Sequence, residues 1–225
     1  MSILKKLGIG LVVLIAIIAI FIFFVTRGDT ATLSMDEVTG DDPVLDEPDA
    51  ETFPTVAIAD PVGWEEGETP AAAEGLTVER FAVGLDHPRT LYTLPNGDVL
   101  VSLTRSPNQE SEGILSWITN TLMNKAGATG PSANEVVLLR DADGDGNAET
   151  RRVLIDGLDS PSGLAYADGI LYVANHDQVL AFPYELGSDR VTAKPRKVID
   201  LAGGGGHWMR NLKLHPEGNL LYIAV

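Results

Sequence analysis

The sequence contains no cysteine. Disulfide bonds and thiolate-ligated metal sites are therefore excluded. A bacterial periplasmic protein needs no disulfides, whereas a small secreted animal domain is more often cross-linked by them. The sequence also lacks the Gly-x-Ser-x-Gly, P-loop, His-Glu-x-x-His and Rossmann glycine patterns, which argues against hydrolase, kinase and nicotinamide-dependent functions.

Basic residues are absent from one long segment. Between Gly28 and Glu79 there are fifteen aspartates and glutamates and no lysine or arginine, so most of the net charge of −16 lies here. The segment is also rich in proline and poor in large apolar residues, a composition typical of a disordered, self-repelling spacer. We expect residues 28–75 to form an acidic linker, and the acidic charge argues against nucleic acid as a partner.

Charge is absent altogether from the nineteen residues Leu7–Val25, which are long enough to cross a bilayer as a helix. No small-x-small cleavage site follows them, so we interpret residues 1–27 as an uncleaved membrane anchor. Lys5 and Lys6 precede the span and only Arg27 follows it closely. This bias predicts a single-pass inner-membrane protein with a cytoplasmic N-terminus and the rest of the chain in the periplasm.

From about Leu76 the pattern changes to short apolar runs of period two, separated by Gly, Pro and Asn-Gly or Asp-Gly turns. This pattern predicts β-hairpins. The block Gly-Leu-Asp-x-Pro leads into a hairpin at residues 84–88 and again at 157–161, and a third copy begins near His207. The later spacing of 45 to 50 residues matches one four-stranded blade of a β-propeller, so residues 76–225 are predicted to be all-β.

The spacing between the first and second copies of the block is longer, which implies an insertion at about residues 106–133. Ile114, Trp117, Ile118 and Leu122 recur there at helical intervals, which predicts a helix. Its apolar stripe suits packing on the rim of the propeller. The alternatives are a lid on the substrate side and a helix that touches the membrane.

Residues 76–225 supply only about three blades, whereas a propeller needs more to close its ring. The sequence also stops at Val225 on an apolar strand with no polar cap, which would leave an exposed edge. We therefore expect an incomplete propeller and the N-terminal part of a longer protein.

An acidic motif lies in the first predicted blade. Residues 141–149 fit Asp-x-Asp-x-Asp-Gly-x-x-Glu, in which alternating carboxylates converge on a hard cation such as Ca²⁺. The predicted metal ligands are Asp141, Asp143, Asp145 and Glu149. An acidic hairpin turn without metal is the alternative, and a bound ion would be structural rather than catalytic.

The glycine run 203–206 leads into the densest group of candidate site residues. It permits close approach of backbone to a ligand. A base, a large ring, a cation and an amide follow it, namely His207, Trp208, Arg210 and Asn211. Arg105, at the end of a predicted inner strand, suits either an anionic cofactor or a loop carboxylate. The other histidines, His87, His176 and His215, are expected to be exposed or hydrogen-bonded in turns.

Several blocks together resemble the sorbosone dehydrogenase branch of the glucose/sorbosone dehydrogenase family. They are residues 84–88, 139–146, 157–158, 171–175, 182–184 and 205–212. The resemblance covers residues 76–225 and includes neither the anchor nor the linker.

The resemblance implies a six-bladed propeller that carries pyrroloquinoline quinone (PQQ) and calcium and oxidises an aldose or related carbonyl sugar in the periplasm. It implies that His207 is the general base, which accepts the hydroxyl proton while a hydride passes to the quinone. It also implies that Arg210 balances the charge of the quinone, with Arg105, Trp208 and Asn211 as candidate cofactor contacts. Because that family draws further contacts from later blades, the chain alone is expected to be inactive.

Two other functions stay open at the level of sequence. One is a calcium-dependent propeller lactonase without a redox cofactor. The other is a non-catalytic propeller that binds a polysaccharide or a protein. The identities of the sugar and of the electron acceptor do not follow from the sequence.

Overall fold

The computed structural model describes residues 3–25, 32–45, 58, 60–65, 67–107, 113–203 and 207–225. The chain divides into two compact units, residues 1–59 and 60–225. Residues 60–75 of the expected linker are thus grouped with the strands. Most of the remaining expected linker, together with Gly204–Gly206 of the glycine run, lies outside the described residues.

The first unit contains two helices, α1 (Ile3–Val25) and the short α2 (Met35–Val38). Within α1, residues Lys5–Phe24 have a mean hydropathy of 3.2 and are not buried. At 1.5 Å per residue this helix is roughly 35 Å long, about the thickness of the hydrocarbon core of a bilayer. The helix is therefore long and apolar enough to span a membrane.

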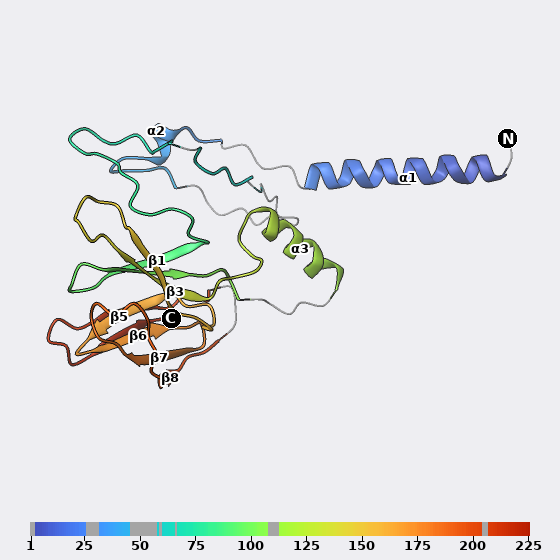
Figure 1. Cartoon of the computed structure of the whole chain (residues 1–225). Helices are drawn as coiled ribbons and strands as arrows, with labels where there is room; N and C mark the ends of the chain where they lie inside the picture. Colours follow the sequence, from blue (N-terminus) through green and yellow to red (C-terminus); the bar gives the residue numbers. More distant parts are fainter. Residues whose placement is uncertain are drawn as a thin grey trace. The chain divides into compact units, whose positions relative to one another are not determined.

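The regular structure of the second unit consists mainly of antiparallel strands (Figure 1). Its strands are β1 (Pro88–Thr93), β2 (Val99–Leu103), β3 (Glu135–Arg140), β4 (Thr150–Ile155), β5 (Gly163–Ala167), β6 (Ile170–Ala174), β7 (Gln178–Pro183), β8 (Arg196–Asp200), β9 (Asn211–Leu214) and β10 (Leu221–Ala224). Two four-stranded sheets follow the chain order, β1-β2-β3-β4 and β5-β6-β7-β8, and β9 pairs with β10. Sequential four-stranded meanders are the blades of a propeller, so the all-β, partial-propeller prediction is confirmed.

The sheets pack face to face on a shared core. Leu100 and Leu138 of the first sheet and Leu171 and Val173 of the second are fully buried in one cluster. The first strands of the blades are neighbours, because β5 contacts both β1 and β9. The starts of these strands therefore lie near one another, which brings together the side chains and connections at that end.

Helix α3 (Ile114–Lys125) lies in the long connection between β2 and β3, where the sequence predicts a helix. Its apolar side chains are largely exposed: 78% of Ile114 and 68% of Trp117 are accessible. The stripe is therefore largely open to solvent rather than buried against the sheets.

Candidate functional site

The connections that lead into the first strands meet the β2–β3 and β6–β7 connections at one end of the blades. We call this the site end; it comprises residues 84–87, 104–107, 113–134, 157–162, 175–177, 201–203 and 207–210. Backbone hydrogen bonds tie these segments together, since the Thr104 amide donates to the His87 carbonyl and the His176 amide to the Asp159 carbonyl. The site end is thus an assembly of loops from successive blades.

His207 lies at the site end, immediately before the strand β9. Its residue is exposed, and its backbone carbonyl accepts a hydrogen bond of 2.8 Å from Nη1 of Arg210. The imidazole is thus reachable from solvent, while the backbone beneath it is fixed. These features suit a side chain that exchanges protons with a bound molecule.

Arg210 is only 2% exposed. Its Nη2 donates to the carbonyl of Ala202 at 2.8 Å, and its Nη1 also donates to the carbonyl of Met209 at 3.2 Å. Its Nε is buried and has no hydrogen-bond partner among the described residues. The guanidinium therefore closes the loop that carries His207, a placement that sequence reasoning did not anticipate.

Trp208 and Asn211 flank this arginine in different surroundings. The indole of Trp208 is buried, and the Arg89 guanidinium carbon lies 5.5 Å from the ring centroid, a cation–π distance. Asn211 is exposed at the start of β9, opposite Ala224. Trp208 therefore belongs to the core, whereas a ligand can reach the side chain of Asn211.

Arg105 is held at the site end of the first blade. Its Nη2 is 3.2 Å from Oδ1 of Asp86, and its Nη1 donates to the carbonyl of Thr129 at 3.0 Å. The pKa of Asp86 is lowered, mainly by a hydrogen bond from His87. Burial raises this pKa in part, and Arg105 lowers it further. Of the two sequence interpretations of Arg105, the loop-carboxylate pair is present in this structure.

The acidic motif lies at the opposite end of the first blade. Leu103 pairs with Glu135 near the site end, so the hairpin that follows Arg140 is at the far end of the same strands. The ligand oxygens of Asp141, Asp143, Asp145 and Glu149 lie within 4.8 Å of one another. The carboxylates converge as a calcium loop requires, but away from His207.

Asp141 organises this acidic loop. Its two carboxylate oxygens accept hydrogen bonds from the amides of Gly144 and Gly146 at 2.7 and 2.9 Å. Both glycines have positive φ, 78° and 91°, which favours glycine over other residues. The sequence motif therefore dictates the loop conformation that draws the carboxylates together.

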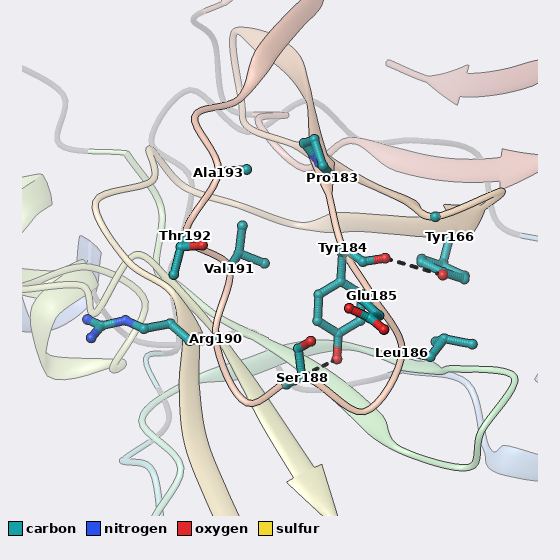
Figure 2. Close-up of a pocket in the computed structure, with 11 residues that line it drawn as sticks. Tyr166, Pro183, Tyr184, Glu185, Leu186, Ser188, Arg190, Val191, Thr192 and Ala193 are labelled. Atoms are coloured by element: carbon teal, nitrogen blue, oxygen red, sulfur yellow. Dashed lines mark hydrogen bonds between the residues drawn. The ribbon is translucent and has the colours of Figure 1, made fainter.

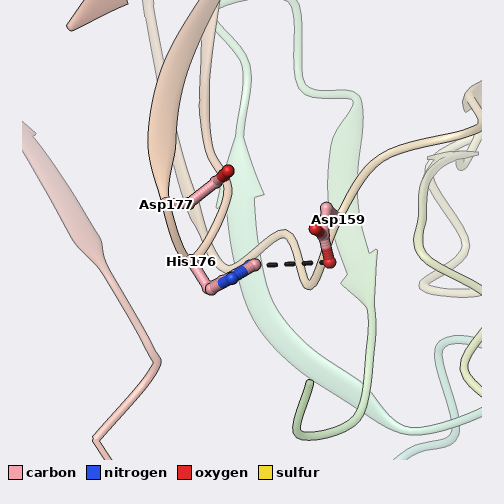
Figure 3. Close-up of side chains that lie close together, drawn as sticks. All are labelled: Asp159, His176 and Asp177. Atoms are coloured by element: carbon pink, nitrogen blue, oxygen red, sulfur yellow. Dashed lines mark ion pairs between the residues drawn. The ribbon is translucent and has the colours of Figure 1, made fainter. Parts of the chain in front are cut away.

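A second group of metal-binding side chains was not predicted. Asp159, His176 and Asp177 have ligand atoms within 4.8 Å of one another (Figure 3). Asp159 and His176 also line a cavity of about 410 Å³ together with Ser106, Pro107, Gly130, Ser132, Asn134 and Ser160. The available signal was the repeat itself, because Asp159 occupies the place in Gly-Leu-Asp that Asp86 has in the first blade.

Another cavity, of about 760 Å³, lies beside the β7–β8 connection, away from the site end (Figure 2). The hydroxyl of Tyr184 donates to the carbonyl of Ser188 at 2.9 Å, and that of Tyr166 to the carbonyl of Tyr184 at 3.3 Å. Burial, helped by the charge of Asp98, raises the pKa of Tyr184 to about 12. This phenol stays protonated at neutral pH and is a poor base.

Among the described residues, no hydrogen bond or ion pair joins Arg105 to residues 207–211. The structure thus brings His207, Arg210 and Asn211 together on one loop and strand end, with Trp208 beneath. Arg105 lies at the same end of the molecule but belongs to the first blade, whereas residues 207–211 lead into the third.

Comparison with known proteins shows the fold. No family model matches the chain, and no curated protein does. Two structures of a Trichoderma reesei carbohydrate-active enzyme of family AA12, with iodide and with calcium, match at TM-scores of 0.51 and 0.50 and 21% identity. The PQQ domain of pyranose dehydrogenase from Coprinopsis cinerea matches at a TM-score of 0.46 and 15% identity, over 63% of this chain and 28% of that domain's chain.

The match to the AA12 structures covers 69% of this chain and 34% and 33% of theirs. The chain therefore spans about a third of the length of these enzymes. At this identity the likeness establishes a shared fold.

Proposed function

We propose that this protein is a PQQ-dependent oxidoreductase that acts on a sugar, an aldose or a sorbosone-like carbonyl sugar. The observation that carries the proposal is the position of His207. It is an exposed histidine that follows a glycine run and precedes a first strand, at the end where the blade connections meet. The family resemblance of the sequence and the shared fold with a carbohydrate-active enzyme support the same assignment.

In this proposal His207 accepts the proton of the sugar hydroxyl. When bound, PQQ would accept the hydride that leaves the carbon bearing that hydroxyl. Arg210 fixes the backbone of His207 through its carbonyl and so helps to orient the imidazole. Exposure of the histidine gives the proton a route to solvent.

The described residues fit the cofactor in part. His207 and Asn211 are exposed and are proposed to contact it. Arg105 retains a buried Nε without a partner among the described residues, which makes it a candidate for the cofactor's carboxylates. Arg210 likewise has a buried Nε without a partner among the described residues, while its Nη groups hold backbone carbonyls.

Calcium is proposed to bind at Asp141, Asp143, Asp145 and Glu149 and to stabilise the hairpin. Because this loop is at the far end of the blade from His207, the ion would not take part in the reaction. The acidic loop therefore does not supply the metal that the lactonase alternative needs beside the substrate.

The proposed location is the inner membrane, with α1 as a single-pass anchor and the blades in the periplasm. The apolar length of α1 supports a membrane span, and the lysines before it support a cytoplasmic N-terminus. The proposed domain organisation is the anchor 1–27, the linker 28–75 and the propeller 76–225.

The test is sugar-dependent dye reduction by the protein from the complete reading frame, expressed with its anchor and reconstituted with PQQ and Ca²⁺. A panel of aldoses and sorbosone identifies the substrate class. We expect reduction that requires both the sugar and PQQ. Lactone hydrolysis that a chelator abolishes and PQQ leaves unchanged would instead establish the lactonase, and polysaccharide binding without turnover would establish a binding module.

A further inference from the structure

The Asp159, His176 and Asp177 cluster has a counterpart in the first blade. Asp86 and Asp159 are the third residues of the two Gly-Leu-Asp blocks. Each faces a nitrogen-bearing side chain that stands two residues after the second strand of its blade: Arg105 after β2, at 3.2 Å, and His176 after β6, at 3.5 Å. The repeat therefore places an aspartate opposite a nitrogen-bearing side chain in both blades, with an arginine in the first blade and a histidine in the second.

The two positions differ in their charge. In the first blade the guanidinium of Arg105 supplies a fixed positive charge beside Asp86. In the second blade an imidazole and a second carboxylate, that of Asp177, take its place, and no lysine or arginine of the described segments pairs with Asp159 or Asp177. Two carboxylates and an imidazole gain from a cation between them.

Two atoms of the cluster lack partners. His176 Nδ1 and Asp177 Oδ1 are buried, and neither has a hydrogen bond to any described residue. The 3.5 Å contact between His176 Nδ1 and Asp159 Oδ1 is an ion-pair distance without the geometry of a hydrogen bond. Buried polar atoms without partners cost free energy, which a bound cation would recover.

The spacing suits a small metal ion. Two ligands that each lie about 2.1 Å from Zn²⁺ and are 3.5 Å apart subtend an angle of about 110°, close to tetrahedral. One imidazole with two carboxylates is a donor set for Zn²⁺ and similar first-row ions rather than for Ca²⁺. Asp159 has a 57% exposed side chain and opens onto the cavity of about 410 Å³, which gives the ion a path of entry.

We propose that Asp159, His176 and Asp177 form a binding site for a divalent first-row transition-metal ion, joining the β6–β7 turn to the loop before β5 (Figure 3). The backbone around it is already closed, because the Leu201 amide donates to the Asp177 carbonyl. A Cβ at Gly203 would lie 3.3 Å from Asp177 Cβ. The metal would thus fix the loop that leads to His207.

The test is Zn²⁺ titration by calorimetry on the full chain in detergent micelles, stripped with chelator and free of PQQ and sugar. We expect one Zn²⁺ equivalent whose affinity falls at least about tenfold in His176→Gln. Asp159→Asn, at an exposed residue, should weaken binding as well and decides the matter if His176→Gln does not fold. The double variant Asp141→Asn/Asp143→Asn, which disables the acidic loop, should keep this Zn²⁺ affinity.

Circular dichroism establishes that each variant is folded. The proposal is overturned if the folded wild type binds no Zn²⁺, or if both variants bind as the wild type does, the result expected of an adventitious ion only. Since neither PQQ nor sugar is present, the outcome is independent of the oxidoreductase proposal.

Discussion

Ser162 and Arg210 exchange two hydrogen bonds between adjacent blades. The Arg210 amide donates to Ser162 Oγ at 2.8 Å, and the same hydroxyl donates to the Arg210 carbonyl at 3.0 Å. Both residues are buried, at 0% and 2% exposure. One hydroxyl thereby couples the start of β5 to the start of β9 and fixes the loop that carries His207.

Ser162→Ala should lower the free energy of unfolding by about 1–3 kcal/mol, because it leaves a buried amide and a buried carbonyl without partners. Urea denaturation of the wild type and the variant measures this difference. Ser188→Ala is a matched control, since the Ser188 carbonyl, and not its hydroxyl, accepts from Tyr184. An equal loss of unfolding free energy in both variants would show that the hydrogen bonds between Ser162 and Arg210 do not stabilise the fold.

Gly163→Ala should destabilise the fold more than the addition of one methyl group usually does. A Cβ at this position would lie 2.5 Å from the Arg210 carbonyl oxygen and 3.0 Å from the Leu212 amide nitrogen, so β5 and β9 must separate. We expect a loss of about 2 kcal/mol or more from overpacking. Gly63→Ala is the control, because no heavy atom lies within 4 Å of its added Cβ, and a stable Gly163→Ala would show that the blades are loosely packed.

Asp98→Asn should change how stability depends on pH. Both oxygens of the buried Asp98 accept from Arg140, at 2.8 and 2.9 Å, and this hydrogen bonding lowers the pKa of Asp98 while burial opposes it. Because the folded-state pKa lies below the unfolded value of about 3.9, the stabilisation is present above that pH and is lost as pH falls through the folded-state pKa. The variant should be less stable by roughly 2 kcal/mol at pH 7.

Urea denaturation between pH 7 and pH 2 measures this effect. The difference between wild type and Asp98→Asn should shrink as the pH is lowered below about 4. A difference that stays constant over the whole range would show that the carboxylate charge does not stabilise the fold.

Calcium should raise the thermal stability of the protein through the acidic loop. Asp141→Asn should remove most of this effect, because Asp141 both offers a ligand and orders the Gly144 and Gly146 amides. Differential scanning calorimetry at increasing Ca²⁺ measures the shift, which follows ligand concentration by mass action. His176→Gln is the control and should respond to Ca²⁺ as the wild type does.

Sequence periodicity predicted the strands because period-two apolar runs and glycine turns are local signals. The helix within residues 106–133 was predicted for the same reason, but its exposed side chains were not, since exposure depends on neighbours. Arg210 looked like a ligand-facing cation, and only the folded loop shows that its guanidinium holds backbone carbonyls. Likewise, Asp159 and His176 are seventeen positions apart in sequence and meet only through the pairing of β5 with β6.

The acidic motif of residues 141–149 was recognisable because its carboxylates and glycines are contiguous. The site end was harder to predict because it is assembled from several connections. Its members share no contiguous pattern apart from the repeated Gly-Leu-Asp block.

The most direct test of the proposed chemistry is the rate at which sugar reduces bound PQQ in a single turnover, followed by absorbance in the protein from the complete reading frame. Removal of the base in His207→Ala should slow this step by about 10²–10⁴-fold when the variant is saturated with PQQ. His215→Ala, in the β9–β10 turn at the far end of the blade, is the matched histidine control and should leave the rate unchanged. A rate in His207→Ala equal to that of the wild type would contradict the account.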